Sequence, residues 1–135
     1  MHGDMTLLES LNLSFNKLHE LDGRIGAFTA LQQLDCRQNC LVSISNQLHC
    51  CTELTSIDLS DNLLQDLPPG LKDCKKLLSV KIARNRLKVM PEGLASTHQL
   101  TSLDLRENEI STVPANTFAK LKALEVLFLQ HNKVL

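Results

Sequence analysis

A single pattern, written six times along the chain, constrains this sequence more than any other feature. The stretch LTSIDLSDN at residues 54–62 returns as LTSLDLREN at residues 100–108. Other copies lie before, between and after these two, and their first leucines are separated by steps of 23, 23, 23, 23 and 24 residues. These leucines are Leu8, Leu31, Leu54, Leu77, Leu100 and Leu124. A period of this size is typical of stacked supersecondary units, because one unit cannot bury its own apolar side.

The residue types at fixed places of each copy predict its local structure. Apolar residues recur at the first, fourth, sixth and eleventh places, and asparagine occupies the ninth place in every copy. The alternation around the fourth and sixth places has a period of two, so these side chains point to one side of a short strand. The connection to the next strand is about a dozen residues long, which favours parallel strands joined by a turn or a 3₁₀ helix.

The asparagines follow each strand at the point where the chain turns away from it. An amide side chain has donors and an acceptor, so it can satisfy backbone groups that a tight turn would otherwise bury without partners. We therefore expect a structural ladder of asparagine side chains inside the stack. Its members are Asn16, Asn39, Asn62, Asn85, Asn108 and Asn132.

The motif L-x-x-L-x-L-x-x-N-x-L resembles that of the leucine-rich repeat family, from about residue 5 to the end of the chain. The resemblance implies an α/β fold: a right-handed solenoid with a parallel β-sheet on its concave face and short helical or 3₁₀ turns on its convex face. Pro68, Pro91 and Pro114 are similar to the prolines of the 23-residue intracellular class found in signalling scaffolds, and the first two repeats lack them. The stretch VPANTFAKLKAL is similar to a slightly longer class.

The repeats predict a single domain over residues 1–135. We expect repeats at residues 8–30, 31–53, 54–76, 77–99 and 100–123, and a partial repeat at residues 124–135. Solenoids need terminal units with a polar outer face, and neither end of the sequence shows one. We therefore expect a piece of a longer array, and the oligomeric state is open.

Composition and charge narrow the classes of partner and the location. The formal net charge is −1, which argues against a nucleic acid or an anionic membrane as the partner. The start MHGDMTLLES has neither the basic nor the apolar segment of a secretory signal. Five cysteines at irregular spacing do not make a disulfide framework and favour reduced thiols. The expected location is therefore the cytoplasm.

Cysteine and histidine do not form a metal-binding pattern. The run His49-Cys50-Cys51 suggests zinc, but the chain has no C-x-x-C or H-x-x-x-H spacing. Cys36, Cys51 and Cys74 occupy inward places that larger apolar residues fill in other repeats, so we expect them in the core. No glycine-rich phosphate loop and no G-x-S-x-G motif is present. We therefore expect no enzyme activity, no cofactor and no metal.

The outward-facing places of the strands form the concave face, which is the usual binding surface of solenoids. Equal places are neighbours in parallel strands in register, so we expect Lys81 between Asp58 and Asp104, and Arg84 likewise between two acidic residues. One interpretation is a structural charge ladder in which each pair contributes about 0.2–1 kcal/mol. The other is the footprint of a partner. The residues expected at a partner-binding surface are Asp58, Asp61, Lys81, Arg84, Asp104, Arg106 and Phe128.

These features predict a protein–protein interaction scaffold that binds a partner protein on its concave face. One alternative is the recognition or regulatory arm of a larger enzyme, such as a kinase, phosphatase, cyclase or ubiquitin ligase, because such enzymes carry similar arrays. Another is a fragment of a receptor ectodomain. The fold alone does not identify the partner, because this architecture serves many unrelated ones.

Overall fold

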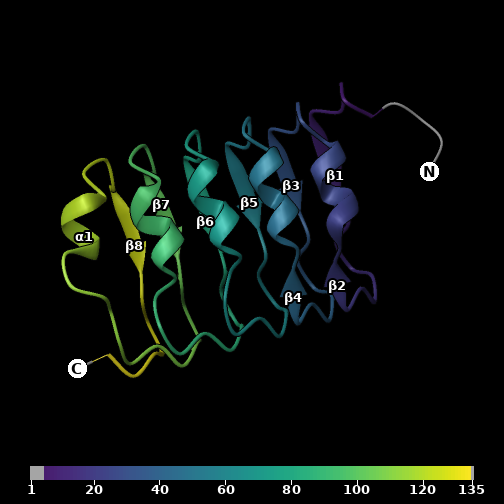
Figure 1. The fold of residues 1–135 in the computed structure, drawn as a ribbon. Helices are drawn as coiled ribbons and strands as arrows, with labels where there is room; N and C mark the ends of the chain where they lie inside the picture. The colour runs from purple at the N-terminus through teal and green to yellow at the C-terminus, as the bar shows by residue number, and fades with distance from the viewer. Residues whose placement is uncertain (1–4, 135) are drawn as a thin grey trace.

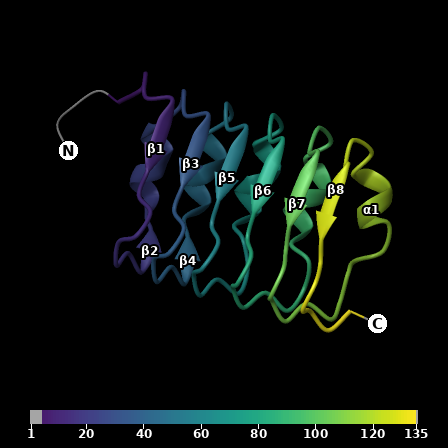
Figure 2. The same cartoon turned by 180° about the vertical axis from the view of Figure 1, so that it is seen from behind.

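The structure of the chain, a computed structural model, describes residues 5–134. Within them, six strands form one parallel sheet. In spatial order they are β1 (Ser10–Asn12), β3 (Gln33–Asp35), β5 (Ser56–Asp58), β6 (Ser79–Lys81), β7 (Ser102–Asp104) and β8 (Val126–Phe128). Figure 1 shows the helical turns on the near side, and Figure 2 shows the strands from behind, side by side. The expected α/β solenoid with a parallel sheet on its concave face is confirmed.

Short helices on the other side of the sheet form the convex face. Those of the first four repeats are 3₁₀ helices: η1 (Gly23–Ala27), η2 (Asn46–Cys50), η3 (Pro69–Asp73) and η4 (Glu92–Ser96). The fifth repeat carries a four-residue α-helix, α1 (Thr117–Lys120), preceded by Asn116 with a left-handed backbone. The longer stretch VPANTFAKLKAL therefore closes its turn as an α-helix instead of a 3₁₀ helix.

The strands pair in register, so equal places of successive repeats lie next to one another. Leu34 pairs with Ile57, and Val80 pairs with Leu103. These four side chains point into the solenoid and are at most 2% exposed. They belong to one hydrophobic core that runs through the repeats. Burying one such side chain contributes about 1.5–3 kcal/mol, so the stacking of repeats stabilises the fold.

The ninth-place asparagines link each repeat to the one before it. Asn62 Nδ2 donates to the carbonyls of Cys36 and Leu59, both at 3.0 Å, and its Oδ1 accepts from the Leu41 amide at 2.9 Å. Equivalent contacts are made by Asn39, Asn85, Asn108 and Asn132. Each asparagine thus satisfies one amide and two carbonyls at the strand end. Asn16, in the first repeat, donates only to carbonyls of its own repeat.

The residue before each asparagine has a left-handed backbone, a feature that the sequence analysis did not predict. The φ angles of these residues lie between 52° and 60°. They are Phe15, Gln38, Asp61, Arg84, Glu107 and His131. An L-residue in this region costs roughly 1–2 kcal/mol, and none of the six is glycine. From Phe15 to Glu107, each amide donates to a carbonyl of the next repeat, as Gln38 does to Ser60 at 3.0 Å, and this bond holds the turn.

A second parallel sheet, two strands wide, lies on the flank of the first two repeats. It pairs β2 (Glu20–Leu21) with β4 (Ser43–Ile44), and the Ser45 amide donates to the Leu21 carbonyl at 2.7 Å. Here the sequence analysis predicted turns only. In the next repeat, Pro68 takes the place of Ser45 and has no amide hydrogen to donate, so the pairing stops.

Replacing Gln38 with valine is expected to destabilise the solenoid by roughly 1–2 kcal/mol, because a β-branched side chain is strained in the left-handed region. Denaturant unfolding followed by circular dichroism measures the change. Gln33→Val is the matched control, because Gln33 is exposed on strand β3, where a β-branched residue is favoured. Equal stability of the two variants would contradict the importance of the left-handed turn.

Candidate functional site

A hollow of about 360 Å³ lies on the outer face of the six-stranded sheet, over the strands and the left-handed turns that follow them. All seven residues expected at the partner-binding surface line it: Asp58, Asp61, Lys81, Arg84, Asp104, Arg106 and Phe128. Phe15, Arg37, Gln38, Ser60 and Ser102 complete the lining. We call this hollow the turn groove. The register of the sheet therefore gathers residues from all six repeats into one concave surface.

Arg84 is the centre of an ion-pair network in the turn groove. Its Nε lies 2.6 Å from Asp61 Oδ1, its Nη2 lies 3.1 Å from Asp61 Oδ2, and its Nη1 lies 3.7 Å from Glu107 Oε2. The hydrogen bonds with Asp61 raise the pKa of Arg84 above its ordinary value. The network has the arrangement that the sequence predicts, with one arginine between two acidic neighbours. Because the side chains are partly exposed, each pair contributes at most about 1 kcal/mol, but together they fix the direction of the guanidinium.

Asp104 lines the turn groove but is buried, so it offers little surface to a partner. Arg106 donates to its carboxylate from Nε at 2.9 Å and from Nη2 at 2.6 Å, and the Arg106 amide donates to Oδ1 at 3.1 Å. Burial alone would raise the pKa of Asp104, but the hydrogen bonds from Arg106 outweigh it and the pKa is lowered. Only 6% of Asp104 is exposed. Its role is to position Arg106, which faces the groove.

The guanidinium group of an arginine lies over each of two aromatic rings in the turn groove. The Arg106 guanidinium lies 5.0 Å from the centre of the Phe128 ring, and the Arg37 guanidinium lies 5.9 Å from that of Phe15. Such a contact is worth about 0.5–1 kcal/mol at an exposed site. Both rings are exposed and offer apolar area of the kind that anchors protein interfaces. The sequence analysis selected Phe128, and the fold adds Phe15 from the first repeat.

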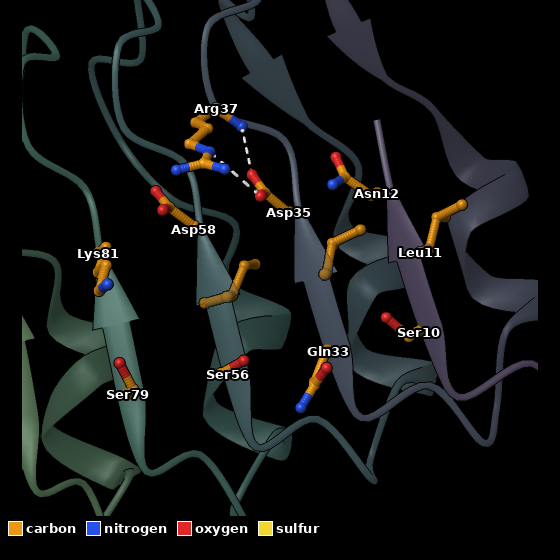
Figure 3. A pocket seen from close by; sticks show the side chains of 12 residues that line it. Ser10, Leu11, Asn12, Gln33, Asp35, Arg37, Ser56, Asp58, Ser79 and Lys81 are labelled. Carbon is orange, nitrogen blue, oxygen red and sulfur yellow. Dashed lines mark hydrogen bonds and ion pairs between the residues drawn. The ribbon is translucent and has the colours of Figure 1, made fainter. Parts of the chain in front are cut away.

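A second hollow, of about 490 Å³, lies over strands β1, β3, β5 and β6 (Figure 3). Its floor is a row of third-place residues: Ser10, Gln33, Ser56 and Ser79. The side chains of this row have no hydrogen-bond partner in the part of the chain that the structure describes. We call this hollow the strand groove. This row was not predicted from the sequence as part of a binding surface, although serine occupies the third place in four repeats.

Lys81 lies where the two grooves meet. Arg37, Asp58 and Lys81 line both of them. Lys81 pairs in register with Asp58 on one side and Asp104 on the other, as the sequence predicts. Its ammonium nevertheless forms no ion pair within residues 5–134. Asp104 is already paired with Arg106, and the Asp58 carboxylate accepts a hydrogen bond from the Ser60 amide at 3.0 Å.

The buried cysteines are core residues with protonated thiols. Cys36, Cys51 and Cys74 have no exposed surface. The Cys51 thiol donates to the Ile25 carbonyl at 3.3 Å, and the Cys74 thiol donates to the Leu48 carbonyl at 3.5 Å. Burial raises the pKa of Cys36 and Cys74 to about 12 and that of Cys51 to about 11. These thiols therefore behave as small apolar side chains, which confirms the prediction for the three places.

The described residues contain neither a metal-binding cluster nor a membrane-spanning helix. No cluster of three or more histidine, cysteine or acidic side chains in residues 5–134 is arranged to hold a metal ion. No helix in this range is both long enough and apolar enough to span a bilayer.

Comparison of the sequence and the structure with known proteins agrees with the repeat fold described above. A family model described as leucine rich repeat matches residues 6–64 and 75–134. A leucine-rich repeat protein of Leptospira interrogans superposes with a TM-score of 0.83 and 30% identity, over 87% of this chain and 30% of that one. The ectodomain of the Arabidopsis thaliana membrane receptor kinase GASSHO1/SCHENGEN3, in complex with CASPARIAN STRIP INTEGRITY FACTOR 2, gives a TM-score of 0.80 and 32% identity, over 93% of this chain and 16% of that one. No curated protein sequence matches significantly. The chain thus spans less than a third of either solved protein.

Replacing Lys81 with glutamate is expected to lower the melting temperature, because it places a carboxylate between Asp58 and Asp104. Like charges on neighbouring strands cost roughly 0.2–1 kcal/mol per pair. Thermal unfolding by circular dichroism measures the effect. Lys72→Glu, on the convex helix η3, is the control for the change in net charge. An unchanged melting temperature would show that Lys81 has no structural role and would favour a binding role.

The buried thiols predict a loss of stability at high pH. A thiol in the unfolded chain loses its proton near its ordinary pKa of 9.0, whereas Cys36 in the folded chain keeps its proton to about pH 12. The contribution of the buried thiols to the free energy of unfolding is therefore complete below pH 9. It decreases as the pH rises from the ordinary pKa of 9.0 to the raised pKa of about 12.

Denaturant unfolding between pH 8 and 11 tests this expectation. Cys36→Ala is the matched variant, because it removes one of the buried ionisable groups and should flatten the decline. In the folded chain at pH 8, a thiol reagent should modify only Cys40 and Cys50, which are half-buried. Reaction of all five cysteines before unfolding would contradict the burial of the other three.

Proposed function

Because the chain belongs to the leucine-rich repeat family, we propose that it binds another protein on the concave face of its sheet. The observation that carries the proposal is that the turn groove and the strand groove meet on this face and are lined by residues from every repeat. Exposed rings and oriented guanidinium groups are the features of protein-binding surfaces. The ectodomain of GASSHO1/SCHENGEN3, which has the same fold, was solved in complex with CASPARIAN STRIP INTEGRITY FACTOR 2.

The ion pairs support this proposal because they order the surface before a partner arrives. Arg84 and Arg106 are each held by two hydrogen bonds to a carboxylate. A side chain that is already fixed loses little entropy on binding, which would otherwise cost about 0.5–1.5 kcal/mol per long side chain. The charge ladder and the binding surface are therefore compatible, with the ladder supplying the rigidity.

The proposed role is that of an interaction scaffold in the cytoplasm. Support for the location is that Cys36, Cys40, Cys50, Cys51 and Cys74 are all free thiols, which suits a reducing compartment. A fluorescent fusion of the chain, imaged with markers of the cytoplasm and the secretory pathway, tests the location. Entry into the secretory pathway would contradict it.

A second candidate function is the recognition arm of a larger protein. It is favoured by the lengths of the similar solved chains, of which this chain covers 30% and 16%. One of them is the ectodomain of a receptor kinase. In this candidate the array recruits a substrate or a ligand for a kinase, phosphatase, cyclase or ubiquitin ligase, or belongs to a receptor ectodomain. The concave face is the binding surface in both candidates.

A tagged chain incubated with cell lysate is expected to retain a partner that the double variant Lys81→Glu, Arg84→Glu loses. The control is Lys72→Glu, Lys75→Glu, which makes the same change of charge at exposed residues of the convex side. Circular dichroism establishes first that both variants are folded, and mass spectrometry identifies what is retained. Retention of the same proteins by both variants would place the footprint away from the concave face.

A further inference from the structure

The arginines of the two grooves are already engaged by carboxylates of this chain. Arg37 lies 3.2 Å from Asp35, and Arg84 and Arg106 each make a two-point contact with an aspartate. A carboxylate from a partner would have to displace one of these internal carboxylates to bind there. The arginines are therefore less favourable than an unpaired cation as the first contact of an acidic partner.

Lys81 differs from these arginines because its ammonium has no ion-pair partner in the described chain. It is exposed, and it lines both grooves. An ammonium group carries three donors, all of which are available here to an incoming acceptor. An unpaired cation among paired ones marks the point at which a ligand of opposite charge binds without displacing an internal partner.

Serine hydroxyls beside Lys81 add further donors. Ser79 precedes Lys81 by two residues on strand β6, so the two side chains stand on the same face of the sheet. Ser56 pairs with Ser79 across the neighbouring strand, and Figure 3 shows both serines in the row below Lys81. Neither hydroxyl has a partner within the described residues. An ammonium and two hydroxyls together suit the several lone pairs of one carboxylate.

The shape of the strand groove favours an extended chain as the occupant. Its floor of third-place residues, three serines and Gln33, crosses four parallel strands, and a wall of longer side chains stands beside it (Figure 3). Four strands about 4.8 Å apart span about 14 Å, which about five extended residues cover. A short linear segment can therefore lie across the strands along this floor and pass below Lys81.

We propose that the concave face binds an extended polypeptide segment that places the carboxylate of one aspartate or glutamate on Lys81, with the Ser56 and Ser79 hydroxyls beside it. The inference rests on the proposed function and specifies the chemistry of the partner. Asp58 lines both grooves beside Lys81 and repels a second carboxylate, whereas Asp61 is already paired with Arg84. The surface therefore selects an isolated acidic residue over an acidic run, through repulsion as well as attraction.

The probe for this inference is a display library of random 12-residue linear peptides, selected on the immobilised chain. Enriched peptides are expected to carry one aspartate or glutamate among uncharged residues. Fluorescence anisotropy of a labelled peptide then measures its affinity for each variant. Lys81→Met should weaken binding about five-fold or more, whereas Lys72→Met on the convex face should not change it. Lys81→Glu should bind the same peptide again once its acidic residue is replaced by lysine.

A blocking variant separates failure of this inference from failure of the proposed function. Ser79→Trp fills the strand groove from a half-buried position on strand β6 without changing a core residue. The selection could yield peptides that lose binding to Ser79→Trp and yet lack an acidic residue or bind Lys81→Met normally. Such peptides would overturn the proposal of an acidic residue on Lys81 and would leave the concave face as the binding surface. Peptides that bind Ser79→Trp as well as the unmodified chain would overturn the strand groove as their site, whereas the proposed function is contradicted only if the Lys81→Glu, Arg84→Glu variant also keeps the lysate partner. A selection that enriches no peptide would overturn the linear segment as the occupant.

Discussion

The hydrogen bonds of the ninth-place asparagines are the contacts on which the rest of the solenoid depends. The chain must turn sharply at the end of every strand, and that turn leaves an amide and two carbonyls inside the protein. One asparagine satisfies all three, and it does so by joining its own repeat to the one before it. An unsatisfied buried group would cost about 1–3 kcal/mol at each turn. The same contact therefore closes the turn and sets the register, and the register aligns the rows of side chains on the concave face.

The features that the sequence predicts well are those fixed by position in the repeat. The strands, their parallel register, the inward leucines, the core cysteines and the placement of Arg84 between Asp61 and Glu107 all follow from counting places along the chain. Each has a single geometric outcome once the period is known. For the same reason, the seven residues selected from the sequence do line one groove.

The features that the sequence analysis missed depend on a choice between partners. An aspartate at the fifth place can pair with a cation on the next strand or with an arginine two residues later in its own repeat. Asp35-Cys36-Arg37 and Asp104-Leu105-Arg106 take the second option, with the backbone amide of the arginine bonded to the same carboxylate. Repeat four has Ala83 where those repeats have arginine, and its Lys81 is left without a partner in the described chain. The pairing of Asp104 with Arg106 and the loss of Asp104 as a partner for Lys81 are two results of this one competition.

The flank of the solenoid gives its repeats unequal stiffness. The first two repeats are joined by backbone hydrogen bonds on the concave sheet and again between β2 and β4. Residues 65–68 make no such bond to a neighbouring repeat in the described chain, and the flank is joined again between Val89 and Thr112. Backbone hydrogen bonds thus join the middle repeats along the concave sheet only, whereas they join the repeats on either side along both the concave sheet and the flank. We therefore expect a change in the curvature of the solenoid to be concentrated in the middle repeats, one of which carries Lys81, and to widen or narrow the grooves without separating a strand.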